Sequence, residues 1–98
     1  MREFLRGAVQ IHILHHAAEG EVYGAWMAEE LARHGYEISP GTLYPTLHRM
    51  EDRGLLTSRK VVVGGRSRRV YRVTPAGRKA LRRARKALRE LGNEVLGD

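Results

Sequence analysis

Three histidines lie close together near the start of the chain, at His12, His15 and His16. If this segment is helical, their spacings place the imidazoles along one broad side, and two imidazoles four residues apart can hold a divalent metal ion. His12 and His16 are therefore candidate metal ligands, and Glu19, His34 or a residue of a second chain could complete the site. Two alternatives stay open: ordinary packing or surface groups at a subunit interface, or groups that make such an interface sensitive to pH.

The arginines are the second group of side chains whose type and number indicate a chemical role. The 98 residues include 18 Lys and Arg against 11 Asp and Glu, a formal net charge of +7, and residues 59–98 hold thirteen basic and only three acidic side chains. Guanidinium groups donate a planar fork of hydrogen bonds that fits phosphate oxygens, so this half of the chain favours nucleic acid as a partner. A merely solubilising surface and an anionic membrane surface are the alternatives.

The composition also argues against several classes of protein. There is no cysteine, which removes disulfides, thiolate metal sites and cysteine nucleophiles. No apolar window approaches the roughly 18 residues of a membrane span, and the N-terminal segment lacks the apolar stretch of a signal peptide, so we expect a cytoplasmic protein. No phosphate loop, nucleophile elbow or zinc protease motif is present, so we expect neither an enzyme nor a required cofactor.

The elements that position these groups are predicted from hydrophobic spacing and from helix-boundary residues. We expect helices over residues 2–18, 23–34, 39–53 and 75–96, and a hairpin over residues 55–73 with a turn at Gly64-Gly65 and a returning strand over 69–73. Ser39-Pro40 and Thr74-Pro75 are each a capping residue followed by a proline suited to the first helical position. The order predicts a mainly α fold: a winged helix-turn-helix domain over residues 1–74 and a C-terminal dimerisation helix over 75–98.

The first and last predicted helices carry more apolar surface than a small domain of this kind can cover by itself. In the last helix, apolar residues from Gly77 onward alternate spacings of four and three, which is the seam pattern of a coiled coil. The first helix has a broad apolar face, which indicates more than one packing partner. We therefore predict a homodimer with contacts from Phe4, Ala8, Ile11, Leu81, Ala84, Leu88, Leu91 and Val95.

The third predicted helix has short or polar side chains at its start, Ser39, Gly41 and Thr42. They let the backbone approach a groove floor or a phosphate, where the free N–H groups of a helix N-terminus favour an anion. Arginines at the hairpin tip can reach a neighbouring phosphate or a narrow minor groove. Together these features predict a winged helix that binds double-stranded DNA.

Two stretches closely resemble the PadR-like transcriptional regulators. The run ISPGTLYPTLHRMEDRGL at residues 38–55 is similar to the signature of that family, and so is GRSRRVYRVTPAGR at residues 65–78. Gly7, Ile13-Leu14 and Val22-Tyr23-Gly24 also match. The short chain and single terminal helix resemble the smaller PadR subfamily. The chain departs from the family at Ala25-Trp26, where an aromatic followed by an acidic residue is commoner.

The resemblance implies a homodimeric repressor of a near-palindromic operator, whose terminal helix pairs with the partner subunit and whose DNA affinity responds to a small aromatic compound or another effector. It places Tyr44 at the DNA face, with its hydroxyl on a phosphate; packing against the helix-turn-helix is the alternative. The residue pattern and the resemblance together give these candidate DNA contacts: Ser39, Gly41, Thr42, Tyr44, Pro45, His48, Arg49, Arg66, Arg68 and Arg69.

Two further questions stay open at this level. Trp26 is either a core residue or the wall of a cavity for a flat effector, and a divalent metal at His12 and His16 is the other candidate effector. The alternative functions are a basic nucleoid or RNA-associated protein without sequence preference, and an interaction adaptor that uses the terminal helix.

Overall fold

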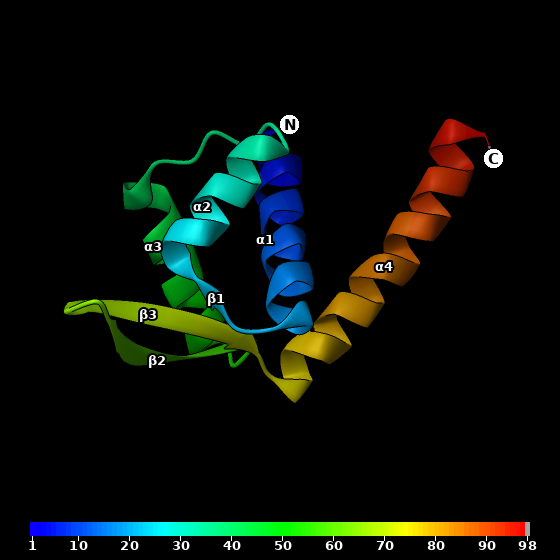
Figure 1. The fold of residues 1–98 in the computed structure, drawn as a ribbon. Helices are drawn as coiled ribbons and strands as arrows, with labels where there is room; N and C mark the ends of the chain where they lie inside the picture. The colour runs from blue at the N-terminus through cyan, green and yellow to red at the C-terminus, as the bar shows by residue number, and fades with distance from the viewer. Residues whose placement is uncertain (98) are drawn as a thin grey trace.

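Four helices and three strands follow one another in the computed structural model, which describes residues 1–97. Helices α1, α2 and α3 pack beside a small sheet, and α4 leaves this body as a long projecting rod (Figure 1). The elements are α1 (Arg2–Glu19), β1 (Val22–Tyr23), α2 (Gly24–Arg33), α3 (Pro40–Asp52), β2 (Leu56–Val63), β3 (Arg66–Val73) and α4 (Pro75–Leu96). The predicted mainly α winged helix with a terminal helix is confirmed.

The core lies where the three packed helices meet the sheet. Ile13 of α1, Leu31 of α2, and Leu43 and Leu47 of α3 are fully buried, and each such side chain contributes about 1.5–3 kcal/mol by leaving water. Leu56 joins them from the sheet. Because one face of α3 is fixed in this core, the opposite face is held at the surface.

The sheet has the strand order β1-β3-β2, with both pairings antiparallel. The hairpin turn consists of Gly64 and Gly65 alone, at φ values of 57° and 77°, a conformation that suits a tight two-residue turn. The returning strand therefore begins at Arg66, so the prediction that it begins at Arg69 is wrong. Arg66 and Arg68 belong to the strand ladder rather than to a loose tip.

Strand β1 and the start of α3 also differ from the sequence predictions. Two residues, Val22 and Tyr23, pair with β3 before α2 begins, a strand too short to show any alternation. The Ser39 side chain does not cap α3: its hydroxyl donates to the Thr42 hydroxyl at 3.3 Å. Thr74, in contrast, accepts a hydrogen bond from the Gly77 N–H at 3.0 Å and caps α4 as predicted.

Helix α4 is anchored through its N-terminal half. A β-carbon at Gly77 would collide with the Leu55 carbonyl oxygen, so only glycine allows the helix to approach the sheet this closely. Leu81 is buried in the core of its own chain, which corrects its place on the predicted dimer seam. Farther along, Leu88, Leu91 and Val95 are exposed.

Residues 1–97 include no helix that is both long enough and apolar enough to pass through a membrane.

Candidate nucleic-acid interface and histidine cluster

The outward face of α3 carries the predicted DNA-contacting side chains. Leu43, Leu47 and Met50 of this helix point into the core, and the helical repeat leaves the other face free. All ten residues predicted to contact DNA are exposed: Ser39, Gly41, Thr42, Tyr44, Pro45, His48, Arg49, Arg66, Arg68 and Arg69. The fold thus presents the outward face of α3 and the hairpin to solvent.

Tyr44 packs against the helix-turn-helix and is also exposed, and its contact with a phosphate stays a prediction. Its ring lies against the α-carbon of Gly24, where a β-carbon would be 2.7 Å from Tyr44 Cε1, yet the side chain is still 43% exposed. Tyr44 also lines a hollow of about 170 Å³ together with Ser67, Arg68 and Arg69 of the hairpin. The recognition helix and the wing therefore form one continuous surface rather than two separate ones.

The three wing arginines are held to different degrees. Arg69 Nη1 donates to the Ser58 hydroxyl at 3.0 Å, and that hydroxyl is in turn 2.9 Å from both carboxylate oxygens of Glu51. The guanidinium of Arg68 lies 5.3 Å from the ring centroid of Tyr23, within cation–π range. Arg66 makes no side-chain hydrogen bond or ion pair with the described residues, which leaves its guanidinium available to a phosphate.

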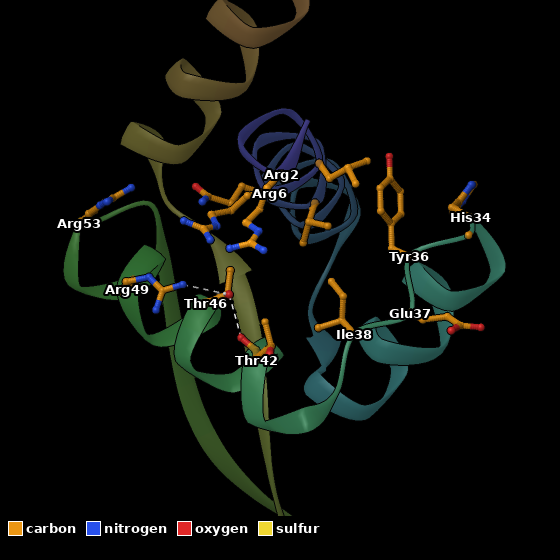
Figure 2. Close-up of a pocket in the computed structure, with 14 residues that line it drawn as sticks. Arg2, Arg6, His34, Tyr36, Glu37, Ile38, Thr42, Thr46, Arg49 and Arg53 are labelled. Carbon is orange, nitrogen blue, oxygen red and sulfur yellow. Dashed lines mark hydrogen bonds between the residues drawn. The ribbon is translucent and has the colours of Figure 1, made fainter.

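A groove of about 850 Å³ runs between α1 and α3 and carries four arginines, Arg2, Arg6, Arg49 and Arg53. Figure 2 shows Arg2 and Arg6 extending from α1 toward α3. Arg49 turns along this groove, donating from Nη2 to the Thr46 hydroxyl at 3.2 Å. Sequence reasoning missed three of the four arginines, because only the packing of α1 against α3 brings them together.

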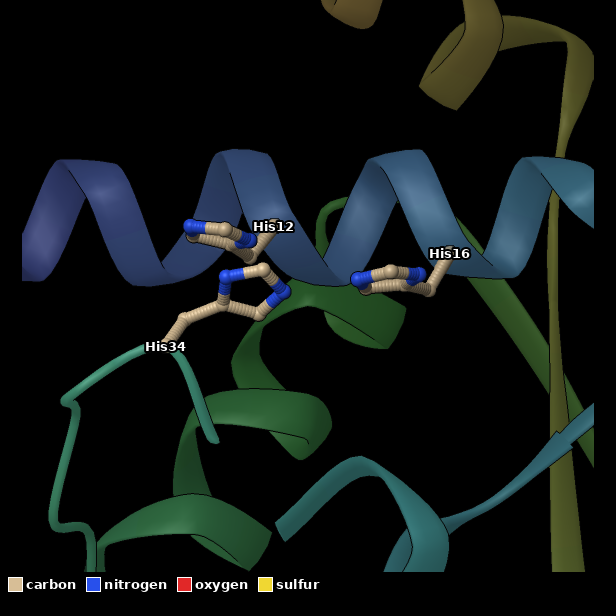
Figure 3. A group of neighbouring side chains, drawn as sticks. All are labelled: His12, His16 and His34. Carbon is tan, nitrogen blue, oxygen red and sulfur yellow. The ribbon is translucent and has the colours of Figure 1, made fainter. Parts of the chain in front are cut away.

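The predicted metal ligands His12 and His16 lie side by side on α1 and face His34 at the end of α2 (Figure 3). One ring nitrogen of each residue lies within 4.8 Å of the other two. His34 was one of several residues expected to complete the pair, and the fold brings it close to both histidines, while metal binding stays a prediction. Burial and the neighbouring imidazoles hold the pKa of His12 below its ordinary value, so its ring favours the neutral form that binds metals.

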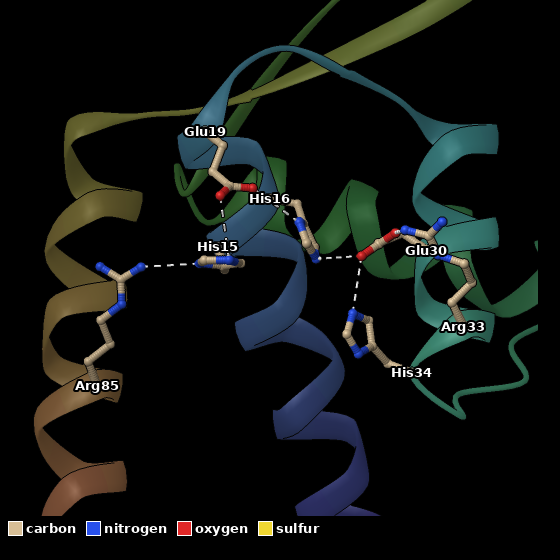
Figure 4. Close-up of polar contacts among 7 residues, drawn as sticks. All are labelled: His15, His16, Glu19, Glu30, Arg33, His34 and Arg85. Atoms are coloured by element: carbon tan, nitrogen blue, oxygen red, sulfur yellow. Dashed lines mark hydrogen bonds and ion pairs between the residues drawn. The ribbon is translucent and has the colours of Figure 1, made fainter.

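A buried carboxylate, Glu30, faces the same cluster, and no sequence pattern predicted its position there. Glu30 Oε2 lies 3.1 Å from His34 Nε2 and 3.5 Å from His16 Nε2, while Oε1 accepts from Arg33 Nη2 at 2.6 Å (Figure 4). Burial opposes ionisation of this carboxyl, but its contacts with His34 and Arg33 outweigh that effect and lower the pKa of Glu30. Glu30 therefore stays a carboxylate near neutral pH.

His15 belongs to a different set of contacts. Its Nε2 lies 3.8 Å from Glu19 Oε2, and its Nδ1 is 3.2 Å from Arg85 Nη2 on α4. His15, His16 and Glu19 also form a group with ligand atoms within 4.8 Å of one another. His15 thus links α1 to α4, and a pH-sensitive interface there stays a prediction.

Trp26 is 40% exposed, so the alternative that it is a core residue is wrong. Met27 and Leu31 occupy the inner face of α2, and Trp26 falls on the outer side, with its ring edge-on to His16 at 5.4 Å between centroids. It borders an open hollow of about 350 Å³. A role in effector binding stays a prediction.

The predicted dimer contacts divide into exposed and partly covered groups. Phe4 is 59% exposed on α1, and Leu88, Leu91 and Val95 are 45–68% exposed on α4. Ala8, Ile11 and Ala84 are half-buried. Large apolar side chains on two adjoining helices are therefore left uncovered by this chain.

Comparison with known proteins places these features in a family. Residues 13–83 match the PadR-like family of transcriptional regulators. Transcriptional regulator Rv3488 of Mycobacterium tuberculosis (strain ATCC 25618 / H37Rv) is 68% identical over 97 residues, covering 99% of this chain and 91% of that protein.

Solved structures show the same fold. The PadR-like regulator BC4206 of Bacillus cereus strain ATCC 14579 superposes with a TM-score of 0.87 at 27% identity, covering 97% of this chain and 94% of that one. Bacillus subtilis PadR in complex with operator DNA gives a TM-score of 0.69 at 22% identity, covering 76% and 46% of the two chains. The match covers most of this sequence and the mycobacterial relative nearly all of it, so the chain belongs to the PadR-like family of transcriptional regulators, a family of regulators and not of enzymes.

Proposed function

We propose that this chain is a cytoplasmic, homodimeric repressor that binds a near-palindromic site in double-stranded DNA and is released by an effector. The observation that carries the proposal is the hollow shared by Tyr44 of α3 and Arg68 and Arg69 of the wing. A helix that enters the major groove and a wing that contacts the adjacent DNA backbone must lie on the same surface of the protein. Residues of α3 and of the wing line this hollow together. The B. subtilis relative of the same fold was solved on operator DNA, which supports the same use here.

The DNA contact proposed for each residue follows from the chemistry of its side chain. Thr42, Pro45 and His48 stand outward on α3, where they can meet base edges, and the Tyr44 hydroxyl can hold a phosphate. Arg66 and Arg68 can contact the backbone beside the groove. Arg49 and the other groove arginines add phosphate contacts on the side of α1.

The dimer is proposed from the uncovered apolar surface on α1 and α4. The partner that covers this surface is a second copy of the chain, because the apolar residues from Ala84 to Val95 repeat at coiled-coil spacing. Helix α4, which carries them, projects beyond the rest of its own chain (Figure 1). A twofold dimer sets two α3 helices about 34 Å apart, one turn of DNA, and so requires two related half-sites.

Footprinting on the DNA upstream of the chain's own gene tests this proposal. We expect two protected half-sites whose centres are about one helical turn apart. Tyr44→Ala and Thr42→Ala should abolish protection while the circular dichroism spectrum is unchanged, and Lys79→Ala on exposed α4 serves as control. Uniform protection without boundaries would favour the alternative, a basic nucleoid or RNA-associated protein that binds without sequence preference.

A further inference from the structure

We propose that His12, His16 and His34, together with the carboxylate of Glu30, form a binding site for a divalent transition metal ion of the Zn²⁺ class. We also propose that this ion is an effector of the regulator. The site stands on its own geometry. The regulatory part rests on the function proposed above.

The ligand atoms are nearly in place. The three ring nitrogens lie within 4.8 Å of one another. Ligands around a tetrahedral Zn²⁺ at about 2.0–2.1 Å are roughly 3.3 Å apart. Closing that difference needs side-chain rotations that unstack the His12 ring from the rings of His16 and His34. Because His34 is exposed at the end of α2, its side chain has room to make them.

His16 supplies an independent reason to expect a ligand. Its side chain is only 10% exposed, and its Nε2 is buried without a hydrogen-bond partner among the described residues. Its Nδ1 lies 3.4 Å from Glu19 Oε1. A tautomer with its proton on Nδ1, facing Glu19, leaves Nε2 with a free lone pair on the side of Glu30, which is the arrangement that orients metal-binding histidines. The Nε2 atom of His16 lies on the side of the cluster, 3.5 Å from Glu30 Oε2.

Glu30 reaches the site from the side of His16 and His34, and we assign its carboxylate as the fourth ligand. A buried carboxylate needs a cationic partner, and Arg33 satisfies only Oε1, at 2.6 Å. Oε2 is directed at His16 and His34, at 3.5 and 3.1 Å. Three imidazole nitrogens and one carboxylate oxygen suit Zn²⁺, Co²⁺ or Ni²⁺, whereas Mg²⁺ and Ca²⁺ prefer sites made entirely of oxygen.

The neighbouring group of His15, His16 and Glu19 is the weaker candidate. His15 is already engaged by Arg85 of α4, and Glu19 is largely exposed. His16 presents Nδ1 to Glu19 and Nε2 to the cluster with His12 and His34. Its Nδ1 is already in contact with Glu19. The ion is therefore assigned to the side of His12 and His34.

The position of the site explains how an ion could act on DNA binding. It joins α1, which carries part of the proposed dimer surface, to the end of α2, and residues 35–39 lead directly from there into α3. Drawing His34 toward α1 moves the segment that enters the recognition helix relative to the dimer axis. The spacing of the two α3 helices in the dimer then changes, and with it the operator affinity.

Calorimetric titration of the full chain with ZnCl₂, without DNA, tests the site. We expect one Zn²⁺ per chain, and at least a tenfold weaker affinity in His16→Ala and in His34→Gln. His48→Ala and His15→Ala are the matched controls and should bind as the parent does. No saturable binding, or equal loss in the controls, overturns the site.

A thermal melt guards against variants that lose binding by misfolding. Zn²⁺ should raise the Tm of the parent and not that of His34→Gln, although both unfold cooperatively without metal. If Zn²⁺ raises the Tm of both equally, the ion binds elsewhere and the assignment is wrong.

The regulatory part is tested on the operator fragment. Operator affinity of the parent should change at least fivefold when the site is filled, whereas His34→Gln should not respond. An unchanged affinity in the parent overturns the effector role while leaving the titration result standing. If the parent protein shows no preference for the operator either with or without metal, the proposed function is contradicted instead. The two failures are therefore distinguishable.

Discussion

The ring of Tyr44 on α3 lies directly against Gly24, the first residue of α2, at a distance that leaves no room for a β-carbon. This contact joins the two helices of the helix-turn-helix at the surface, where Tyr44 also lines a hollow together with residues of the wing. The residue that we propose touches DNA is therefore positioned by a glycine twenty residues earlier in the chain.

Gly24→Ala should displace Tyr44 and weaken operator binding. Inserting a methyl group into so tight a contact costs about 1–3 kcal/mol of stability, unless the ring swings outward. Both responses are visible, as a lower Tm or as reduced DNA affinity. Gly41→Ala is the stability control, because a β-carbon there meets only the Ser39 hydroxyl at 3.7 Å. Unchanged Tm and affinity in Gly24→Ala would show that this contact does not matter.

Arg66→Ala should weaken the affinity for the operator and for unrelated duplexes by a similar factor. A lost phosphate contact lowers the slope of log affinity against log salt by about one. The matched control is Arg89→Ala, which removes the same charge from the far part of α4. Fluorescence anisotropy across a salt series measures both slopes, and equal slopes in the two variants would exclude Arg66 from the interface.

The two leucines of the predicted seam should behave differently. Leu88→Asp should yield a folded monomer by light scattering, because Leu88 is 45% exposed and covered only in the proposed dimer. Leu81→Ala should cost about 2–5 kcal/mol of stability, because Leu81 is 3% exposed in the core of its own chain. A dimer that persists in Leu88→Asp would contradict the seam.

The pair of Glu21 and Arg59 should make stability depend on pH in the acid range. Arg59 donates to both carboxylate oxygens, at 2.9 and 3.0 Å, and lowers the pKa of Glu21 from its ordinary 4.5. A lowered folded-state pKa stabilises the fold above the unfolded-state value and loses that contribution as the pH falls through the folded-state value. The Tm difference between the parent and Glu21→Gln should therefore be small but positive at pH 7 and vanish at lower pH. A difference that grows on acidification would contradict this assignment.

Local sequence features predicted much of this fold. Pro40 and Pro75 marked the starts of α3 and α4, because a proline at the first helical position needs no hydrogen-bond donor. The Gly64-Gly65 turn was equally readable. Strand β1 could not be predicted, because two residues show no periodicity and their pairing with β3 is a tertiary contact.

The sites depended more strongly on tertiary structure. The outward residues of α3 followed from its helical repeat, but the arginines of the groove and the approach of Glu30 to His16 arise from packing between helices. Leu81 fitted the seam by spacing alone, yet the core of its own chain covers it. Periodicity identifies an apolar face without saying which partner buries it.

The most direct test of the central claim is competition between the operator fragment and a scrambled duplex of equal length and composition, at physiological salt. If α3 and the wing read sequence, the operator should be preferred by about 10³-fold or more, and Tyr44→Ala should remove most of that preference. Equal affinities for the two duplexes would contradict the account.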